Sequence, residues 1–271
     1  MKKFSLTFLL VGIMFVLAAC SGSKEEDPTT DDANKSEDDV LAKVQEEGTL
    51  VIGTEGTYPP FTFHDASGEL TGFDVEIARE VADRLGVEAE FLETQWDAMF
   101  AGLDAGRFDM VANQVGINPE RQESYEFSNP YITSTAVLVV AEDNNEIKSF
   151  EDLKGQLSAQ SLTSNYAETA TSFGAELEGV EGFNQAIELL NSGRVDATVN
   201  DNLTVLDFLK QRPDAKVKVI DKSEDAAQSG LLFRKGSGAI VEEANQALAD
   251  MIEDGTYDEI SEKWFGENVL E

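Results

Sequence analysis

Apolar positions along the chain follow two alternating patterns, and together these predict an α/β fold. Short apolar runs such as residues 49–53 have the length and flanking glycine of a buried strand. Between such runs, apolar residues recur every three to four positions, as at Ile77, Ala78 and Val81, which is typical of one face of a helix. Alternation of strands and helices favours a mostly parallel sheet covered by helices on both faces.

The predicted elements fall into two groups. The first group has a helix opened by Ser36, strands at 49–53, 87–92 and 108–112, a hairpin at 61–71, and helices at 73–85 and 96–105. The second group has a β-rich stretch at 131–141, strands at 156–161, 195–199 and 216–220, and helices at 164–173, 183–192 and 202–211. A β-rich segment at 230–234 then leads to a last helix around 240–252. We therefore predict two α/β lobes of roughly 90 residues each.

The N-terminal segment has the features of an export signal. Two lysines precede an apolar run over residues 4–19, which is short for a membrane span but suits a secretory signal peptide. The run ends in Leu17-Ala-Ala-Cys20, which resembles the bacterial lipoprotein signal box and implies cleavage before Cys20 and acyl chains such as palmitate on that residue. The alternative is an ordinary signal peptide with a chance cysteine. Residues 20–39 are polar and acidic, so we expect a lipid-anchored flexible linker.

Composition excludes several classes of function. The chain has 20 Lys and Arg against 53 Asp and Glu, a formal charge of −33, so nucleic acid is not an expected partner. A single cysteine excludes an intramolecular disulfide, and a single histidine excludes a metal site that needs two imidazoles. We expect no cofactor and no metal.

Motifs for catalysis are absent from the sequence. It contains no G-x-S-x-G, Walker, G-x-G-x-x-G or EF-hand segment. His64 lies within the predicted hairpin, where a solvated strand histidine is the expected role. Spacing does not rule out a carboxylate pair for glycoside hydrolysis, but acids are so abundant that any chosen pair is weak evidence. We expect a protein that is not an enzyme.

Five segments carry a resemblance to a known family. They are Gly56-Thr-Tyr-Pro-Pro-Phe61, Gly68-Glu-Leu-Thr-Gly-Phe-Asp-Val75, Ile117-Asn-Pro-Glu-Arg-Gln122, Gly193-Arg-Val-Asp-Ala-Thr-Val-Asn-Asp201 and Asp254-Gly-Thr-Tyr-Asp-Glu-Ile-Ser-Glu-Lys-Trp-Phe-Gly266. In this order they resemble the amino-acid-binding proteins of ABC importers, the polar amino-acid (family 3) class. The resemblance implies a two-lobed, periplasmic-binding-protein-like α/β fold of type II with two crossover hinge segments and a ligand cleft that closes on binding. Its lobes would be 40–136 plus 234–271 and 141–228, with hinges at 137–140 and 229–233.

The same resemblance implies two charged ligand contacts. Arg121 matches the arginine that binds the α-carboxylate of the ligand, and its planar fork suits a bidentate contact. Asp201 matches the aspartate that binds the α-ammonium, at the carboxyl end of a predicted strand. One charge from each lobe would recognise a zwitterion and favour closure of the cleft.

Further positions match the walls of the family's pocket. Tyr58 and Trp96 match aromatic residues that sandwich the ligand side chain, although Trp96 could instead pack in the core. Thr163, Ser164 and Asn165 begin a helix whose free N–H groups would meet the carboxylate, or they act only as a helix cap.

Four more residues complete the predicted site. Asn113, Gln114 and Gly116 occupy the segment where many relatives carry serines, so backbone donors remain there but hydroxyl contacts do not. Glu55 matches a position that touches the distal group of the ligand in some relatives. A carboxylate at that position would meet a second ammonium, or it would lie in solvent.

Residues 113–121 and 158–165 are most similar to cystine-binding members of the family. We therefore expect a monomeric, lipid-anchored receptor on the outer face of the cell membrane, in an organism with one membrane, that delivers L-cystine to an ABC permease. Glutamine or another polar L-amino acid is the alternative ligand. A dehydratase or a lytic transglycosylase on the same scaffold is the alternative function.

Overall fold

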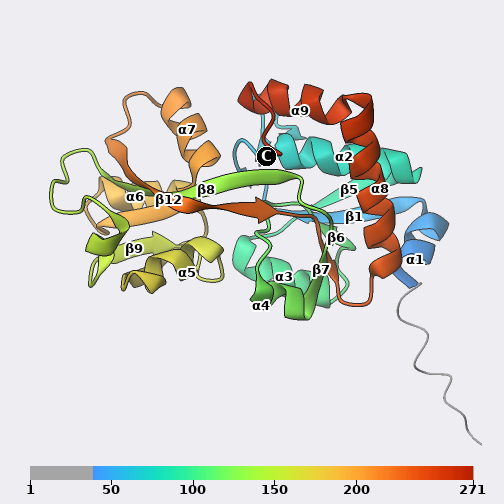
Figure 1. The fold of residues 1–271 in the computed structure, drawn as a ribbon, viewed down its shortest axis with the longest axis horizontal. Helices are drawn as coiled ribbons and strands as arrows, with labels where there is room; N and C mark the ends of the chain where they lie inside the picture. The colour runs from blue at the N-terminus through green and yellow to red at the C-terminus, as the bar shows by residue number, and fades with distance from the viewer. Residues whose placement is uncertain (1–38, 271) are drawn as a thin grey trace, which may run out of the picture. The chain divides into compact units, whose positions relative to one another are not determined.

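The computed structural model describes residues 39–270, which form two lobes, each built around a five-stranded sheet (Figure 1). The predicted signal peptide, Cys20, and all but the last residue of the predicted linker lie outside the described residues. Within residues 39–270, the helices are too short or too polar to cross a membrane.

The sheet of the first lobe has the strand order β5–β1–β6–β13–β7. β1 pairs in parallel with β5 and β6, whereas β13 is antiparallel to both β6 and β7. A small three-stranded sheet, β2–β3–β4, stands beside it. The strands are β1 (Thr49–Thr54), β2 (Thr57–Tyr58), β3 (Thr62–His64), β4 (Leu70–Thr71), β5 (Glu88–Glu93), β6 (Met110–Val111), β7 (Tyr125–Phe127) and β13 (Leu232–Arg234).

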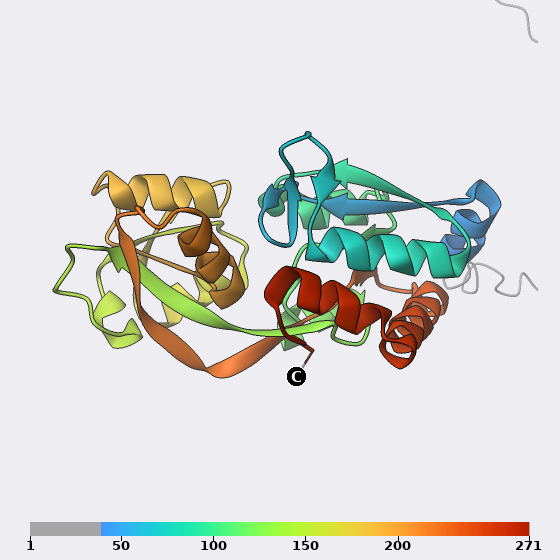
Figure 2. The same cartoon turned by 90° about the horizontal axis from the view of Figure 1, so that it is seen from above.

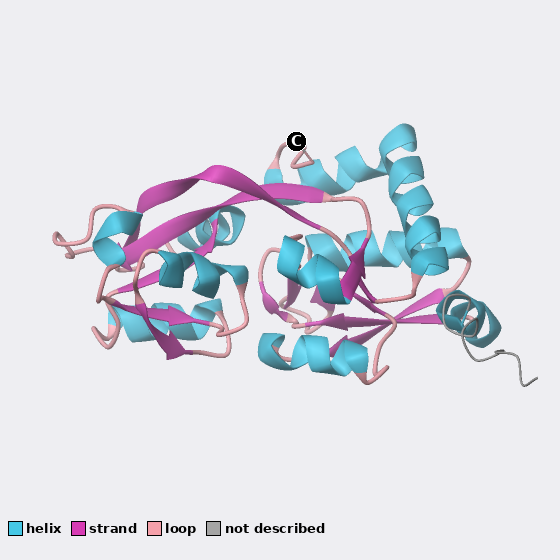
Figure 3. Ribbon diagram, turned by 60° about the horizontal axis from the view of Figure 1, so that its bottom comes forward, coloured by secondary structure: helices cyan, strands magenta, loops and turns pink. Residues whose placement is uncertain are grey.

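Helices cover both faces of the first sheet (Figure 3). Side chains alternate along β1, so Leu50 and Ile52 pack in the core beneath α2, α8 and α9 while Val51 packs with α3 on the other face. The helices of this lobe are α1 (Asp39–Glu47), α2 (Phe73–Leu85), α3 (Trp96–Asp104), α4 (Pro119–Ser124), α8 (Gly238–Asp254) and α9 (Thr256–Phe265).

The sheet of the second lobe has the order β10–β9–β11–β8–β12, with β8 antiparallel to both of its neighbours. Val137 and Val139 of β8 pack beneath α6 and α7, and Leu138 and Val140 pack on the opposite face. The strands are β8 (Ile132–Ala141), β9 (Leu157–Gln160), β10 (Glu176–Gly179), β11 (Ala197–Asp201) and β12 (Val217–Ser229). The helices are η1 (Phe150–Leu153), α5 (Asn165–Ser172), α6 (Phe183–Asn191) and α7 (Asn202–Gln211).

Two long strands, β8 and β12, connect the lobes (Figure 2). Residues 137–140, predicted as one hinge, are paired on both sides within the second sheet, so the crossing lies earlier in β8. There residues 132–135 pair with 226–229 alone and form a two-stranded ribbon between the sheets. The exact lobe boundaries remain a prediction, as does the second hinge at 229–233.

The sheets differ from the mostly parallel prediction in one respect. Each has an antiparallel half, because β13, β7, β8 and β12 belong to the two chain crossings rather than to strand–helix–strand units. His64 ends β3, and its Nε2 lies 3.2 Å from a Glu93 carboxylate oxygen; its side chain is 40% exposed, as expected of a solvated strand histidine.

Candidate ligand-binding site

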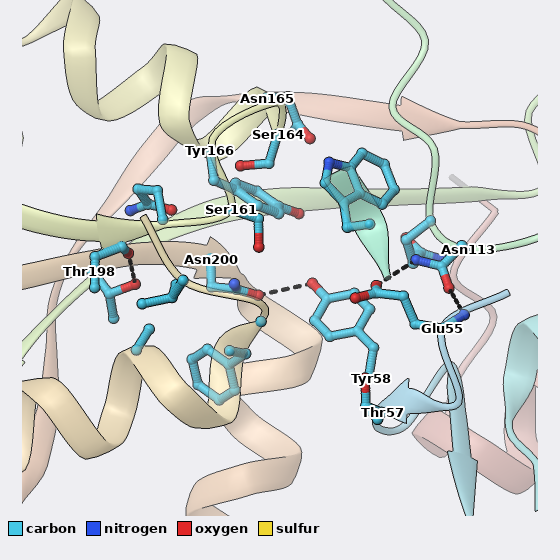
Figure 4. A pocket seen from close by; sticks show the side chains of 18 residues that line it. Glu55, Thr57, Tyr58, Asn113, Ser161, Ser164, Asn165, Tyr166, Thr198 and Asn200 are labelled. Atoms are coloured by element: carbon cyan, nitrogen blue, oxygen red, sulfur yellow. Dashed lines mark hydrogen bonds between the residues drawn. The ribbon is translucent and has the colours of Figure 1, made fainter. Parts of the chain in front are cut away.

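A cavity lies between the two lobes and receives side chains from both (Figure 4). The volume in which the centre of a water molecule can lie is about 50 Å³, enough for a few water molecules. The Tyr58 hydroxyl donates a hydrogen bond of 2.8 Å to Asn200 Oδ1 across this space. The lining residues are Glu55, Thr57, Tyr58, Trp96, Asn113 and Gln114 from the first lobe and Ala159, Gln160, Ser161, Ser164, Asn165, Tyr166, Val180, Gly182, Phe183, Ala186, Thr198 and Asn200 from the second.

Glu55 and Asn113 form a reciprocal pair in the wall of this cavity. Asn113 Nδ2 donates to Glu55 Oε2 at 2.6 Å, and the Glu55 backbone N–H donates to Asn113 Oδ1 at 2.7 Å. Burial raises the pKa of Glu55 to about 7, against the opposing effect of the Asn113 hydrogen bond, and the charge of Asp97 raises it further. Near neutral pH both the protonated and the ionised form of the Glu55 carboxyl are therefore populated.

Arg121 is held by a short, rigid helix. Asn118 caps α4, accepting a 2.8 Å hydrogen bond from the Arg121 backbone N–H, and Pro119 occupies the first turn. The guanidinium lies 5.5 Å from the ring centroid of Trp96 and donates to two carbonyls, Gly116 O at 3.0 Å and Thr163 O at 3.1 Å.

The charge of Arg121 is not balanced locally. The residue is only 8% exposed, and no carboxylate of residues 40–270 lies within ion-pair distance of its guanidinium. Burial lowers the pKa of the guanidinium, because removal from water disfavours its charge. Arg121 is not among the residues that line the cavity described above.

Asp201 occupies the junction of β11 and α7. Its Oδ1 caps the helix by accepting from Leu203 N at 2.7 Å and from Thr204 N at 3.4 Å, and its Oδ2 accepts from the Tyr166 hydroxyl at 3.2 Å. The residue is 2% exposed, and burial raises its pKa. Asp201, too, has no ion-pair partner in the described part of the chain.

A second cavity, of about 580 Å³, lies beside the crossover ribbon and is lined in part by Asp201 and Gly116. Asn165 and Tyr166 line both cavities. Arg121 lines neither cavity. The structure thus brings Arg121 and Asp201 to the region between the lobes without placing them in one shared cavity.

The start of α5 makes contacts across the lobes. Ser164 caps the helix through Oγ, which accepts from Ala167 N at 3.1 Å. The Thr163 backbone N–H and hydroxyl both donate to Asp97 Oδ1, at 3.2 and 2.8 Å. The Thr163 N–H, expected to be free for a carboxylate, therefore already has an acceptor in this arrangement.

The remaining predicted residues, Trp96, Gln114 and Gly116, differ in the cavity they line and in the hydrogen bonds they make. Trp96 lines the cavity, and its buried Nε1 has no hydrogen-bond acceptor among residues 39–270. Gln114 lines the cavity, but its side-chain amide donates to Asp74 at 3.0 Å. Gly116 faces the second cavity, and its carbonyl accepts from Arg121.

The sequence analysis did not select several lining residues. Asn200 directly precedes Asp201 in a segment already noted, and Tyr166 directly follows Asn165, so proximity to the chosen residues was the available signal. Phe183 begins α6 and carries no such signal. Among residues 39–270, no group of three or more His, Cys, Asp or Glu side chains could hold a metal ion.

Comparisons with known proteins agree with this architecture. Residues 50–267 match the family described as bacterial extracellular solute-binding proteins, family 3. The chain is 50% identical over 270 residues to the L-cystine-binding protein TcyA of Bacillus subtilis, covering 99% of both chains. It is 48% identical over 233 residues to a probable amino-acid ABC transporter-binding protein of Haemophilus influenzae, covering 86% of this chain and 91% of that one.

Solved structures show the same two-lobed fold. An ancestral arginine-binding protein bound to glutamine is 40% identical, with a TM-score of 0.78 over 81% of this chain and 99% of its own. An ancestral amino-acid-binding protein described as a precursor of cyclohexadienyl dehydratase is 36% identical, with a TM-score of 0.75 over 83% of this chain and 98% of its own. The L-cystine solute receptor of Neisseria gonorrhoeae in its unliganded open conformation is 48% identical, covering 86% of this chain and 99% of its own, but has a TM-score of only 0.57.

The gonococcal receptor is more similar in sequence than the ancestral protein but has the lower TM-score, so its lobes, rather than its fold, are arranged differently from those of this chain. The lobes of this chain lie nearer to the ligand-bound arrangement than to the open one, in agreement with the hydrogen bonds that cross between them. From the family match, the two-lobed fold and the identity over the whole chain, this protein belongs to family 3 of the bacterial extracellular solute-binding proteins.

Proposed function

We propose that this chain is an extracytoplasmic receptor that captures L-cystine between its lobes and delivers it to the permease of an ABC importer. The observation that carries the proposal is the pair of buried, unbalanced charges: the Arg121 guanidinium and the Asp201 carboxylate, contributed by different lobes. A buried charge is costly unless an opposite charge meets it. The α-carboxylate and α-ammonium of an amino acid would supply the missing charge to each.

Binding requires the lobes and side chains to rearrange. The hydrogen bond from Tyr58 to Asn200 crosses the cavity, and two of the five N–H groups of the Arg121 guanidinium already donate to carbonyls. A carboxylate would replace neutral acceptors with a charged one, which makes stronger hydrogen bonds. The ligand would therefore enter an opened form and be enclosed on closure, with Tyr58 and Trp96 against its side chain.

Glu55 favours a ligand with a second positive group. Cystine carries two zwitterionic ends, so one end would meet Arg121 and Asp201 while the ammonium of the other meets Glu55. The relative TcyA and the gonococcal receptor are both cystine-binding by name, which supports this choice. Arginine also carries a second cation, whereas glutamine would leave the Glu55 carboxylate without an opposite charge. Glutamine or another polar L-amino acid is the alternative ligand.

Calorimetric titration of L-cystine, L-arginine and L-glutamine into protein refolded free of ligand tests the proposal. We expect cystine to bind most tightly, and Arg121→Lys to weaken it at least tenfold because a lysine loses the bidentate fork. Arg234→Lys is the matched control, since Arg234 donates to the carbonyls of Leu103 and Phe108 within the first lobe. Absence of binding by every amino acid offered would refute the receptor, and equal losses in both variants would refute the role of Arg121.

We also propose that the bound amino acid is released unchanged. The two relatives compared above are binding proteins by name, whereas one neighbouring structure is described as the precursor of an enzyme. Mass spectrometry of cystine incubated with the protein should return cystine alone. New products in the presence of wild-type protein, absent with Arg121→Lys, would favour an enzyme.

Anchoring by lipid at Cys20 completes the proposed receptor. The cysteine follows an apolar run that resembles a lipoprotein signal, and a polar linker separates it from α1. Protein expressed in a bacterium with one membrane should be found in the membrane fraction as a monomer carrying acyl chains. Cys20→Ser should carry no acyl chains, and acyl chains on that variant would contradict attachment at Cys20.

A further inference from the structure

We propose that Asp74, a buried carboxylate outside the ligand cavity, is a positioning residue that fixes the pocket loop, residues 113–117, against the crossover between the lobes. This inference rests on the proposed function, because it assigns Asp74 a part in amino-acid binding. Asp74 lies in the first turn of α2, is fully buried, and has no basic partner among residues 39–270.

Three hydrogen bonds converge on this carboxylate. The Gln114 backbone N–H donates to Oδ2 at 2.6 Å, the Gln114 side-chain amide donates to Oδ1 at 3.0 Å, and the Tyr131 hydroxyl donates to Oδ2 at 2.9 Å. Burial raises the pKa of Asp74 to about 7, and the three hydrogen bonds oppose this rise because they favour the charged form. Because Asp74 does not line the cavity, these bonds serve the loop and not the ligand directly.

The loop needs such support because of its backbone. Gln114 has φ of 52°, the only positive φ at a residue other than glycine in residues 39–270. That conformation is unfavourable for a residue with a Cβ and persists only where surrounding contacts enforce it. The neighbouring Asn113 depends on the same turn, and its side chain is the one that orients Glu55.

The same hydrogen bonds reach the crossover. Tyr131 directly precedes β8, and its N–H donates to Ser229 O at 3.0 Å on the returning strand. The pocket loop bonds to that strand as well, from Ile117 N to Gln228 O at 2.8 Å and from Gly230 N to Val115 O at 3.1 Å. Asp74 therefore links the ligand-facing loop to both chain crossings. A loop held in this way before the ligand arrives avoids part of the ordering cost of binding.

Comparison of Asp74→Asn with Asp109→Asn isolates this role. Asp109 is also a fully buried carboxylate of the first lobe, but it accepts from Lys43 Nζ and Val51 N and lies near Arg234, away from the pocket loop. Both variants should unfold at lower temperature than the wild type. Only Asp74→Asn should weaken cystine binding, by at least tenfold.

Hydrogen exchange of the ligand-free proteins supplies a readout that does not depend on binding. Amides of residues 114–117 should exchange at least tenfold faster in Asp74→Asn than in the wild type, and should be unchanged in Asp109→Asn. Adding Gln114→Gly should recover part of the lost affinity, since glycine adopts a positive φ without support. A merely destabilising substitution would not be rescued in this way.

The outcomes separate the two proposals. If the wild type binds no amino acid, the proposed function falls, and the exchange rates alone decide whether Asp74 holds the loop. Unchanged exchange and affinity in Asp74→Asn, or equal losses in Asp109→Asn, would overturn the inference. If Asp74→Asn does not fold, Tyr131→Phe removes one of the three bonds and should weaken binding at least threefold with faster exchange at 114–117; no change in that variant would overturn the inference equally.

Discussion

Glu55→Gln should make the ligand-free protein more stable at alkaline pH. The carboxyl is partly buried, its pKa is raised to about 7 chiefly by that burial, and glutamine keeps an oxygen for Asn113 Nδ2 without a charge to desolvate. A rise from 4.5 to about 7 corresponds to about 3 kcal/mol. Since part of the side chain reaches solvent, we expect a gain of about 1–3 kcal/mol in the free energy of unfolding.

The sign of the pH dependence follows from the direction of the shift. The folded protein binds the Glu55 proton more tightly than the unfolded chain, so the stability from this group is present below pH 4.5 and is lost as the pH rises through 7. Urea unfolding at pH 4 and pH 8.5 should therefore show Glu55→Gln nearly equal to the wild type at the lower pH and more stable at the higher one.

The exposed Glu90 on β5 provides the matched control, and Glu90→Gln should change the stability little at either pH. The buried carboxyls of Asp74 and Asp201 titrate alike in all three proteins, so the difference between them isolates Glu55. Parallel pH profiles for Glu55→Gln and the wild type would refute the reasoning.

Three further predictions use other contacts. If the second ammonium of cystine meets Glu55, binding at pH 6.5 should release the proton of that carboxyl. The binding enthalpy should then vary with the ionisation enthalpy of the buffer. A binding enthalpy that is the same in all buffers would count against the contact. Tyr58→Phe removes the hydrogen bond to Asn200, which contributes about 1 kcal/mol. Distances between spin labels on the two lobes should therefore shift toward those of the open form. An unchanged distance distribution would show that this bond does not keep the lobes closed. Gly53→Ala would place a Cβ 2.7 Å from the buried ring of Phe108 and should cost about 1–3 kcal/mol on urea unfolding; an unchanged midpoint would show that the ring can move.

Much of the fold could be predicted where a local signal coincides with burial. The predicted helix 73–85 matches α2 because its apolar face is continuous and Gly86 ends it with φ of 76°. β12 was predicted only over 216–220, yet it extends to Ser229. Its second half is mostly polar and exposed. It forms a strand because it pairs with β8, and this long-range pairing produces no alternation of apolar and polar residues in the sequence.

Other elements were missed for related reasons. β7 and β10 are short and only partly buried, so they carry no apolar run. α9 follows α8 after a single glycine, and its segment was recognised as a motif without being assigned as a helix.

The site shows the same division between local and tertiary information. The cap and first turn that carry Arg121 could be predicted because Asn118 and Pro119 are local signals. Its contact with Thr163 O joins residues 42 positions apart and depends on how the lobes meet. Asp74 lies in one of the five segments that carry the resemblance, but its role could not be predicted, since only the folded chain shows that it is buried and accepts three hydrogen bonds.

A crystal structure of the protein grown with L-cystine tests the central claim most directly. The account predicts one α-carboxylate of the ligand on the Arg121 guanidinium, displacing at least one of its carbonyl acceptors, and the adjacent ammonium on the Asp201 carboxylate. A bound ligand whose charged ends contact other residues, while Arg121 keeps Gly116 O and Thr163 O and Asp201 keeps only Tyr166 and its helix, would contradict it.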